Sequence, residues 1–123
     1  MIKVETGKEK DCFVAYIEQA LAKLSIEDDD AFLSLFDTSR LSKKDLILAL
    51  RYLDETQPVM KIDDPTSTKN KQDIYLEAFD DSSGYFMDYD LMTDGELNDL
   101  TLQVEFIKKE NGYFVVLNDL RTL

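Results

Sequence analysis

The sequence predicts an α+β fold, in which N-terminal helices pack on one face of a curved antiparallel sheet. In the first half of the chain, apolar residues recur at every third or fourth position, the spacing of one helix face. In the second half they alternate with polar residues between short turn sequences, as in an antiparallel meander. Helices followed by strands indicate an α+β protein, and 123 residues suffice for one core. Residues 1–123 are therefore expected to form a single domain.

The first two helices are predicted from an apolar stripe and a run of acids. Residues 8–24 contain the stripe, and Asp11 lies near the start, where an acid favours the helix dipole. A second, short helix is expected over residues 28–36. We interpret the run Asp28–Asp30 at its start as capping acids rather than a metal site, because adjacent side chains on a helix point in different directions.

The third helix is predicted over residues 42–55, SKKDLILALRYLDE. Ser42 and Asp45 form a capping-box pair at its start, and leucines follow at helical spacing. Pro58 lies beyond its end and prevents continuation. The polar composition of residues 63–72 then predicts a loop.

The strands of the second half are predicted from alternation and from hairpin signals. LTLQVEFI alternates cleanly, and an Asn-Gly pair precedes the last strand. The segment TDGELND, residues 93–99, is expected to be a turn, with Asp94 and Gly95 as its hairpin signal. The expected strands cover residues 74–80, 85–92, 100–107 and 113–123.

Composition indicates a cytoplasmic protein that avoids nucleic acids and membranes. Fourteen bases against 26 acids give a net charge of −12, which repels phosphates and anionic lipids. No apolar run approaches the roughly 20 residues that span a bilayer. The N-terminus has no apolar signal core, and the single cysteine, Cys12, forms no internal disulfide.

The acids are concentrated in one part of the chain, residues 72–107, which we call the acidic segment. It contains ten acids and no base, so it carries −10 of the net −12. A surface that serves solubility alone needs no such concentration, whereas one that meets a basic partner does. Its acids are Asp73, Glu77, Asp80, Asp81, Asp88, Asp90, Asp94, Glu96, Asp99 and Glu105.

The stretch DYDLMTDGELNDL within this segment does not match a calcium loop. An EF-hand loop requires acids at positions 1, 3 and 5, glycine at 6 and glutamate at 12. Starting at Asp88 places Gly95 at position 8, and starting at Asp90 places Met92 at position 3. The flanks also have strand patterns, so no metal site is expected.

Little in the chain points to catalysis, and we predict that it is not an enzyme and holds no cofactor. There is no histidine, so Cys12 has no papain-like partner, and the four glycines form no phosphate loop. Acid–base chemistry by Tyr85, Tyr89 and Asp88 in a sheet cavity remains open. Tyrosines on a sheet more often serve packing or interfaces.

The C-terminal stretch DGELNDLTLQVEFIKKENGYFVVLNDLRTL resembles the closing hairpin of small bacterial immunity proteins, which in turn resemble the nuclear-transport-factor-like cone. The shared features are the acidic DGE turn, the long alternating strand, the tight Asn-Gly turn and the motif LNDL at Leu117–Leu120. The resemblance covers most of the chain in element order and residues 94–123 in motif. It implies a cone-like sheet.

The resemblance also implies a partner-binding role in contact-dependent inhibition or a related polymorphic-toxin system. The partner would be the C-terminal domain of a cognate toxin, a basic nuclease, because surfaces that bind nucleic acid are basic. An acidic inhibitor would occupy that surface as a phosphate surrogate, with electrostatically steered association. The acidic segment, found independently of the resemblance, agrees with this role.

The expected contact residues come from the acidic segment. Asp88, Asp90, Glu96 and Asp99 are preferred because they surround one turn. Tyr85 and Tyr89, with Phe86, would supply aromatic anchors. Alternatively, the charges protect a solvated strand edge from aggregation. The predicted partner-binding residues are Asp80, Asp81, Tyr85, Asp88, Tyr89, Asp90, Asp94, Glu96 and Asp99.

Two other functions remain open at this stage. A cone-fold small-molecule-binding protein or enzyme would have a deep apolar pocket with a few convergent polar groups. A nucleic-acid mimic directed at another DNA-binding protein would share the acidic surface and differ only in its partner.

Overall fold

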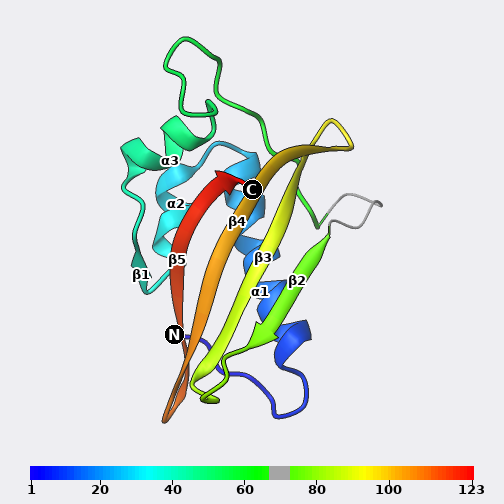
Figure 1. The fold of residues 1–123 in the computed structure, drawn as a ribbon, viewed down its shortest axis with the longest axis vertical. Helices are drawn as coiled ribbons and strands as arrows, with labels where there is room; N and C mark the ends of the chain where they lie inside the picture. Colours follow the sequence, from blue (N-terminus) through cyan, green and yellow to red (C-terminus); the bar gives the residue numbers. More distant parts are fainter. Residues whose placement is uncertain (67–72) are drawn as a thin grey trace.

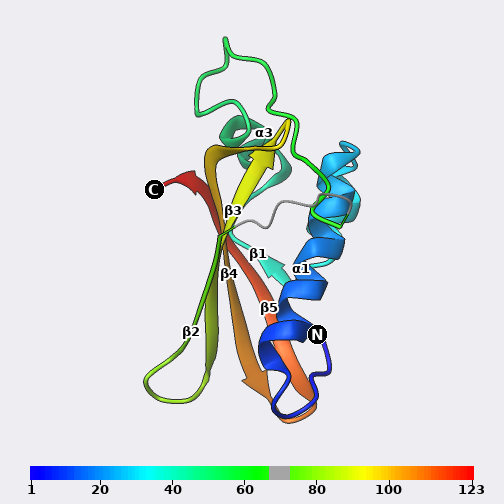
Figure 2. The same cartoon turned by 90° about the vertical axis from the view of Figure 1, so that its right-hand side faces the viewer.

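The computed structural model describes residues 1–66 and 73–123. Its helices lie on one side of a five-stranded, curved sheet, as Figure 1 and Figure 2 show from two directions. The predicted α+β class, with N-terminal helices on a curved sheet, is confirmed. The elements are α1 (Glu9–Ser25), α2 (Asp29–Ser34), β1 (Thr38–Ser39), α3 (Lys43–Ala49), β2 (Ile74–Ala78), β3 (Gly84–Thr93), β4 (Glu96–Lys109) and β5 (Gly112–Thr122).

The sheet is mixed, with the strand order β1-β5-β4-β3-β2. Strands β2 to β5 form the predicted antiparallel meander. The purely antiparallel prediction is wrong at one edge, where β1 pairs with β5 in parallel. The carboxylate of Asp37 fixes this edge by accepting the N–H of Val115 at 2.8 Å. A strand of two residues leaves no periodic signal, so the sequence pattern did not predict it.

The predicted starts of α2 and α3 are confirmed. Asp28 caps α2 by accepting the N–H of Ala31 at 3.1 Å. Ser42 and Asp45 form the capping box of α3, each side chain accepting the other residue's N–H. These bonds satisfy backbone donors that have no partner within the helix.

Helix α3 ends at Ala49, earlier than predicted. Tyr52 and Leu53 adopt left-handed conformations, with φ of 53° and 61°, and the N–H of Leu53 turns back to the carbonyl of Leu48. Left-handed residues at this position end a helix. The phenol of Tyr52 donates to the carbonyl of Asn98 in β4, so a tertiary contact prevails over the helical pattern.

The β3–β4 hairpin is tighter than predicted. Asp94 and Gly95 form the turn, with φ of 53° and 81°, as a two-residue type I′ turn requires. Pairing resumes at Glu96, opposite Thr93. The expected Asp-Gly turn is therefore confirmed, but residues 96–99 belong to β4 and not to the turn.

A side chain from the preceding loop holds this hairpin. The carboxylate of Asp63 accepts the N–H of Asp94 at 3.0 Å and that of Gly95 at 2.8 Å. The predicted polar loop at residues 63–72 lies partly outside the described residues, and Asp63 belongs to its described part. Two charge-assisted bonds thus fix the turn against the body of the protein.

The helices and the sheet enclose one hydrophobic core. Phe13 of α1 stacks on Phe106 of β4 with ring centroids 4.0 Å apart, and Tyr85 and Tyr113 meet Phe13 edge-on. We call the side of the sheet that α1 covers the helix face. Each large apolar side chain buried there stabilises the fold by about 1.5–3 kcal/mol. Core side chains with no exposed surface include Phe13, Ile17, Phe32, Leu46, Met87, Tyr89, Leu102, Phe106, Val115 and Leu117.

Candidate functional site

The opposite side of the sheet is not covered by any described helix, as Figure 2 shows with the sheet edge-on, and we call it the open face. Cross-strand partners share a face, so Tyr85 and its partner Phe106 point to the helices, whereas Phe86 and its partner Glu105 point outward. The open face comprises Tyr75, Glu77, Phe86, Asp88, Asp90, Thr101, Gln103, Glu105, Ile107, Lys109, Phe114, Val116, Asp119 and Arg121.

Carboxylates occupy the centre of the open face, and its two bases lie at the margins. Lys109 lies beside the β4–β5 turn, 5.9 Å from the centre of the Phe114 ring. Arg121, near the end of the chain, lies 3.9 Å from the Asp119 carboxylate. The central acids are Asp88, Asp90 and Glu105, and none of them forms a salt bridge with another described residue.

Neutral donors fix two of these central carboxylates. Asp90 accepts the hydroxyl of Thr101 at 2.7 Å, and Asp88 accepts the side-chain amide of Gln103 at 3.3 Å. Each donor comes from the cross-strand partner of its acid. The bonds restrict the carboxylates without neutralising them, so the negative charge stays directed at solvent.

An aromatic cluster adjoins the carboxylates at the β2 side of the open face. Phe86 lies between Tyr75 and Phe79, with ring centroids 5.8 Å and 6.1 Å away. Tyr75 is 54% exposed, and its hydroxyl donates to Glu77. This hydrogen bond raises the pKa of Tyr75 above its usual value. Exposed aromatic rings beside charges are typical of binding hot spots.

The predicted acids do not surround one turn. Asp88 and Asp90 lie on the open face, two and four residues beyond Phe86 along β3. Asp80 and Asp81 are exposed at the β2–β3 turn, whereas Asp94, Glu96 and Asp99 are exposed at the opposite end. Strand β3 has ten residues, which separates the two ends by roughly 30 Å. The acids therefore form a central group and two terminal groups.

The prediction that Tyr85 and Tyr89 are exposed anchors is wrong. Tyr89 has no exposed surface, and its hydroxyl donates to Glu18 of α1 at 2.6 Å. Burial and the bond to Glu18 raise the pKa of Tyr89. Tyr85 is half-buried against Phe13. Both tyrosines lie on the helix face, opposite Asp88, so these residues also do not converge as an acid–base set.

Strand parity could have separated these residues. In YFMDYDL, the residues Tyr85, Met87 and Tyr89 alternate with Phe86, Asp88 and Asp90. Alternate side chains of a strand share a face. The tyrosines therefore share the face of Met87, which predicts that they belong to the core. Phe86 shares the face of the two aspartates, which predicts that it points outward. Tyr75, Glu77 and Glu105 were not among the predicted contact residues for a different reason, since their strands must first be placed in register.

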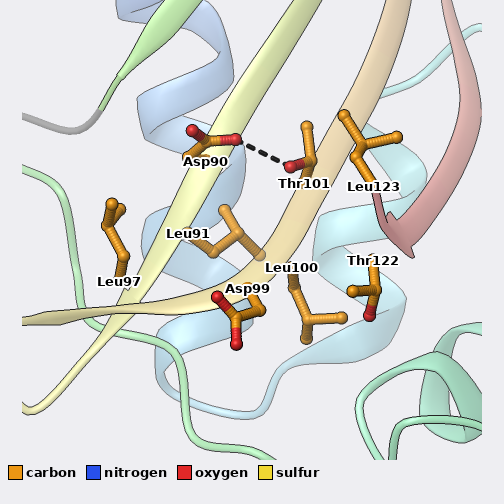
Figure 3. Close-up of a pocket in the computed structure, with 8 residues that line it drawn as sticks. All are labelled: Asp90, Leu91, Leu97, Asp99, Leu100, Thr101, Thr122 and Leu123. Atoms are coloured by element: carbon orange, nitrogen blue, oxygen red, sulfur yellow. Dashed lines mark hydrogen bonds between the residues drawn. The ribbon is translucent and has the colours of Figure 1, made fainter.

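A cleft of about 320 Å³ lies at one end of the open face, where β3, β4 and the end of β5 meet (Figure 3). The carboxyl groups of Asp90 and Asp99 lie on opposite sides of Leu91 in this view. A neighbouring cleft of about 260 Å³ shares Leu100 and Thr122 with the first. Both clefts are open to solvent. The first is lined by Asp90, Leu91, Leu97, Asp99, Leu100, Thr101, Thr122 and Leu123.

A bulge in β4 shapes this cleft. Asp90 pairs with Thr101 and Met92 pairs with Leu97, so three residues of β4 stand opposite Leu91 alone. Asp99, in the middle of the three, has φ of 68° and is exposed. Bulges redirect side chains and are common beside functional sites.

Asn98 holds the bulge in place. Its side-chain oxygen accepts the N–H of Leu100 at 3.0 Å, and its side-chain nitrogen donates to the hydroxyl of Thr93 at 3.0 Å. Its carbonyl accepts the phenol of Tyr52. Burial and the nearby charge of Asp99 raise the pKa of Tyr52. Asp99 is thus presented by a rigid part of the strand.

A family model described as a domain of unknown function, DUF7668, matches residues 19–123. The chain belongs to the DUF7668 family. The DUF7668 match begins within α1 and includes every strand, so the open face and both clefts are part of this domain. No curated protein and no solved structure matches the chain significantly.

Within residues 1–66 and 73–123 of the chain, no group of three acids or cysteines is placed to hold a metal ion. No helix in the same ranges is long and apolar enough to cross a membrane. Cys12 is half-buried on α1. The features of the open face that could contact a partner are therefore its carboxylates, its aromatic cluster and the clefts.

Proposed function

We propose that this DUF7668 domain is an immunity-type inhibitor. It binds a basic protein domain, the nuclease domain of a cognate toxin, and covers the surface that would contact nucleic acid. The observation that supports this proposal is the open face, whose central carboxylates have no described salt-bridge partner and lie beside an aromatic cluster that includes the exposed Tyr75. A nuclease surface built for phosphates is complementary to such a face.

Electrostatic attraction would make association with the partner fast and would account for much of the selectivity for basic proteins. A net charge of −12 steers a basic protein toward the domain, and like charge keeps nucleic acid away. Asp88 and Asp90 are already held by Gln103 and Thr101, so they lose little conformational entropy when a partner binds. The charge pattern thus favours a protein partner whose surface is positive.

The aromatic cluster would supply most of the binding free energy. Tyr75 offers a ring that is 54% exposed, supported from behind by Phe86. Aromatic side chains that become fully desolvated dominate interface energetics, whereas exposed ion pairs contribute little.

The proposal is tested by capture from cells of the source organism, with the purified domain as bait at low and at physiological salt. We expect to recover one basic protein at low salt, and we expect the amount recovered to fall when salt is added, because salt screens the attraction. That protein is then purified, and its cleavage of nucleic acid is measured with increasing amounts of the domain. Stoichiometric loss of cleavage supports the proposal. Capture of acidic or neutral proteins only, or cleavage that persists with excess domain, contradicts it.

A further inference from the structure

The cleft in Figure 3 combines two kinds of lining that suit a single type of side chain. We infer that it is a pocket for an arginine side chain of the partner. This inference rests on the proposed function, because it names the partner group that the open face receives. The guanidinium would lie between the carboxylates of Asp90 and Asp99, and the aliphatic stem would lie along the leucines.

Two of the four leucines that line the cleft are exposed. Leu97 is 52% exposed and Leu123 is 69% exposed, and they enter the cleft from β4 and from the end of the chain. The neighbouring cleft adds Tyr52 and Leu53, which are 41% and 75% exposed. Exposed apolar groups that gather at one place mark an interaction site more often than isolated ones do.

The negative charge of the lining favours a cationic occupant of the cleft over an anionic one. No base lines the cleft, and Asp99 forms no hydrogen bond or salt bridge with the residues that the structure describes. A second copy of this chain would bring further acids against Asp90 and Asp99, and an anionic lipid surface would be repelled in the same way. A cation with an apolar body fits both parts of the lining.

Arginine fits better than lysine for geometric reasons. Asp90 uses one carboxylate oxygen to accept the Thr101 hydroxyl, which leaves its other oxygen and both oxygens of Asp99 for a partner. A guanidinium has five N–H donors in a plane and can reach two carboxylates at once, whereas an ammonium is a compact, strongly hydrated charge. The arginine stem buries its methylene groups while the head stays among polar atoms.

The test is a nuclear magnetic resonance titration of the whole domain with the capped tripeptide acetyl-Gly-Arg-Gly-amide at physiological salt. The matched control peptide carries citrulline, which has the shape of arginine without its charge. We expect saturable shifts of the amide signals of Asp99, Leu100, Thr101 and Leu123 with the arginine peptide. The citrulline peptide should produce none of comparable size.

Two variants separate contact from general charge. Asp99→Asn keeps the left-handed conformation accessible, because asparagine tolerates positive φ, and should weaken peptide binding about fivefold. Glu55→Gln removes one exposed charge outside the strands without altering the lining, and should leave binding nearly unchanged.

The outcomes distinguish this inference from the proposed function. Shifts centred on Asp88 and Glu105 instead of the cleft would overturn the pocket and leave the open face as a site for basic partners. Equal weakening by Asp99→Asn and Glu55→Gln would also overturn it, because only general charge would then be acting. Absence of shifts anywhere on the open face at saturating peptide would count against both.

Discussion

The helix face and the open face are formed by alternate residues of the same strands, yet they have opposite character. Phe106 on the helix face is fully buried against Phe13, whereas Phe86 on the open face is half-buried beside two other rings and three carboxylates. Apolar packing stabilises one face, and the other exposes charge that contributes nothing to packing. The comparison indicates that the side chains that stabilise the fold and those proposed to bind a partner are different residues of one sheet, which can be changed separately.

The largest expected difference between the faces comes from two phenylalanines. Phe106→Ala should lower the free energy of unfolding by about 3–5 kcal/mol, because it leaves a cavity beside Phe13. Phe86→Ala should cost about 1–2 kcal/mol, since this ring is only half-buried. Chemical denaturation of both variants measures the two values. Equal losses would contradict the assignment of the two faces.

The tyrosines provide a second, smaller comparison. Tyr89→Phe should lower the free energy of unfolding by about 1 kcal/mol, because it removes the hydroxyl bonded to Glu18. Tyr75→Phe should change it by less than about 0.5 kcal/mol, because Tyr75 is exposed. Thermal or denaturant unfolding of both variants tests the pair, and a larger loss for Tyr75→Phe would reverse the assigned faces.

Alkaline pH sharpens the comparison at Tyr89. Burial and Glu18 raise the pKa of Tyr89 above the ordinary 10.0, so the folded chain keeps a proton that the unfolded chain releases. The protonated Tyr89 hydroxyl makes its full contribution to the free energy of unfolding below pH 10, and this contribution is lost as the pH rises above 10. Unfolding measured on both sides of pH 10 should show a shallower decline in Tyr89→Phe than in the wild type. An identical decline would contradict the buried position of the hydroxyl.

The smallest expected effect concerns the central carboxylates. Changing Asp88 and Asp90 to Asn and Glu105 to Gln should raise the free energy of unfolding by less than about 1 kcal/mol at low salt, because three like charges are removed from one face of the sheet. The gain should vanish at high salt. Denaturation at both salts measures it. A loss of several kcal/mol would show that these acids support the fold rather than binding.

Much of the fold follows from the sequence because its signals are local. The alternating strands, the Asp-Gly turn and the capping box of Ser42 and Asp45 depend on neighbouring residues, and all are found in the structure. The early end of α3 and the pairing of β1 depend on distant contacts, such as the Tyr52 phenol with Asn98. Periodicity carries no information about such contacts.

The sequence predicted which kinds of residue form the candidate site better than it predicted where they lie relative to one another. Asp88 and Asp90 share the open face, as expected of acids that belong to one surface. The prediction also placed Glu96 and Asp99 around the same turn as these two acids, but the length of the ten-residue β3 separates the central group from the acids at its ends. The cleft depends on a bulge in β4 and on the end of β5, which meet only after folding. The prediction also grouped Tyr85 and Tyr89 with Phe86 as outward rings, although strand parity places only Phe86 of the three on the open face.

The most direct test of the central claim compares two variants that each lose three acids. One carries Asp88→Asn, Asp90→Asn and Glu105→Gln on the open face. The control also loses three acids by amide substitution, at exposed positions outside the strands, namely Asp11→Asn, Glu27→Gln and Glu55→Gln.

Both variants have the same net charge, so nonspecific attraction is matched. The affinity of each for the captured basic protein is measured by calorimetry at physiological salt. If the open face is the binding surface, the open-face variant should bind at least about tenfold more weakly than the control, which corresponds to about 1.4 kcal/mol. Equal affinities would contradict the claim that the open face receives the partner.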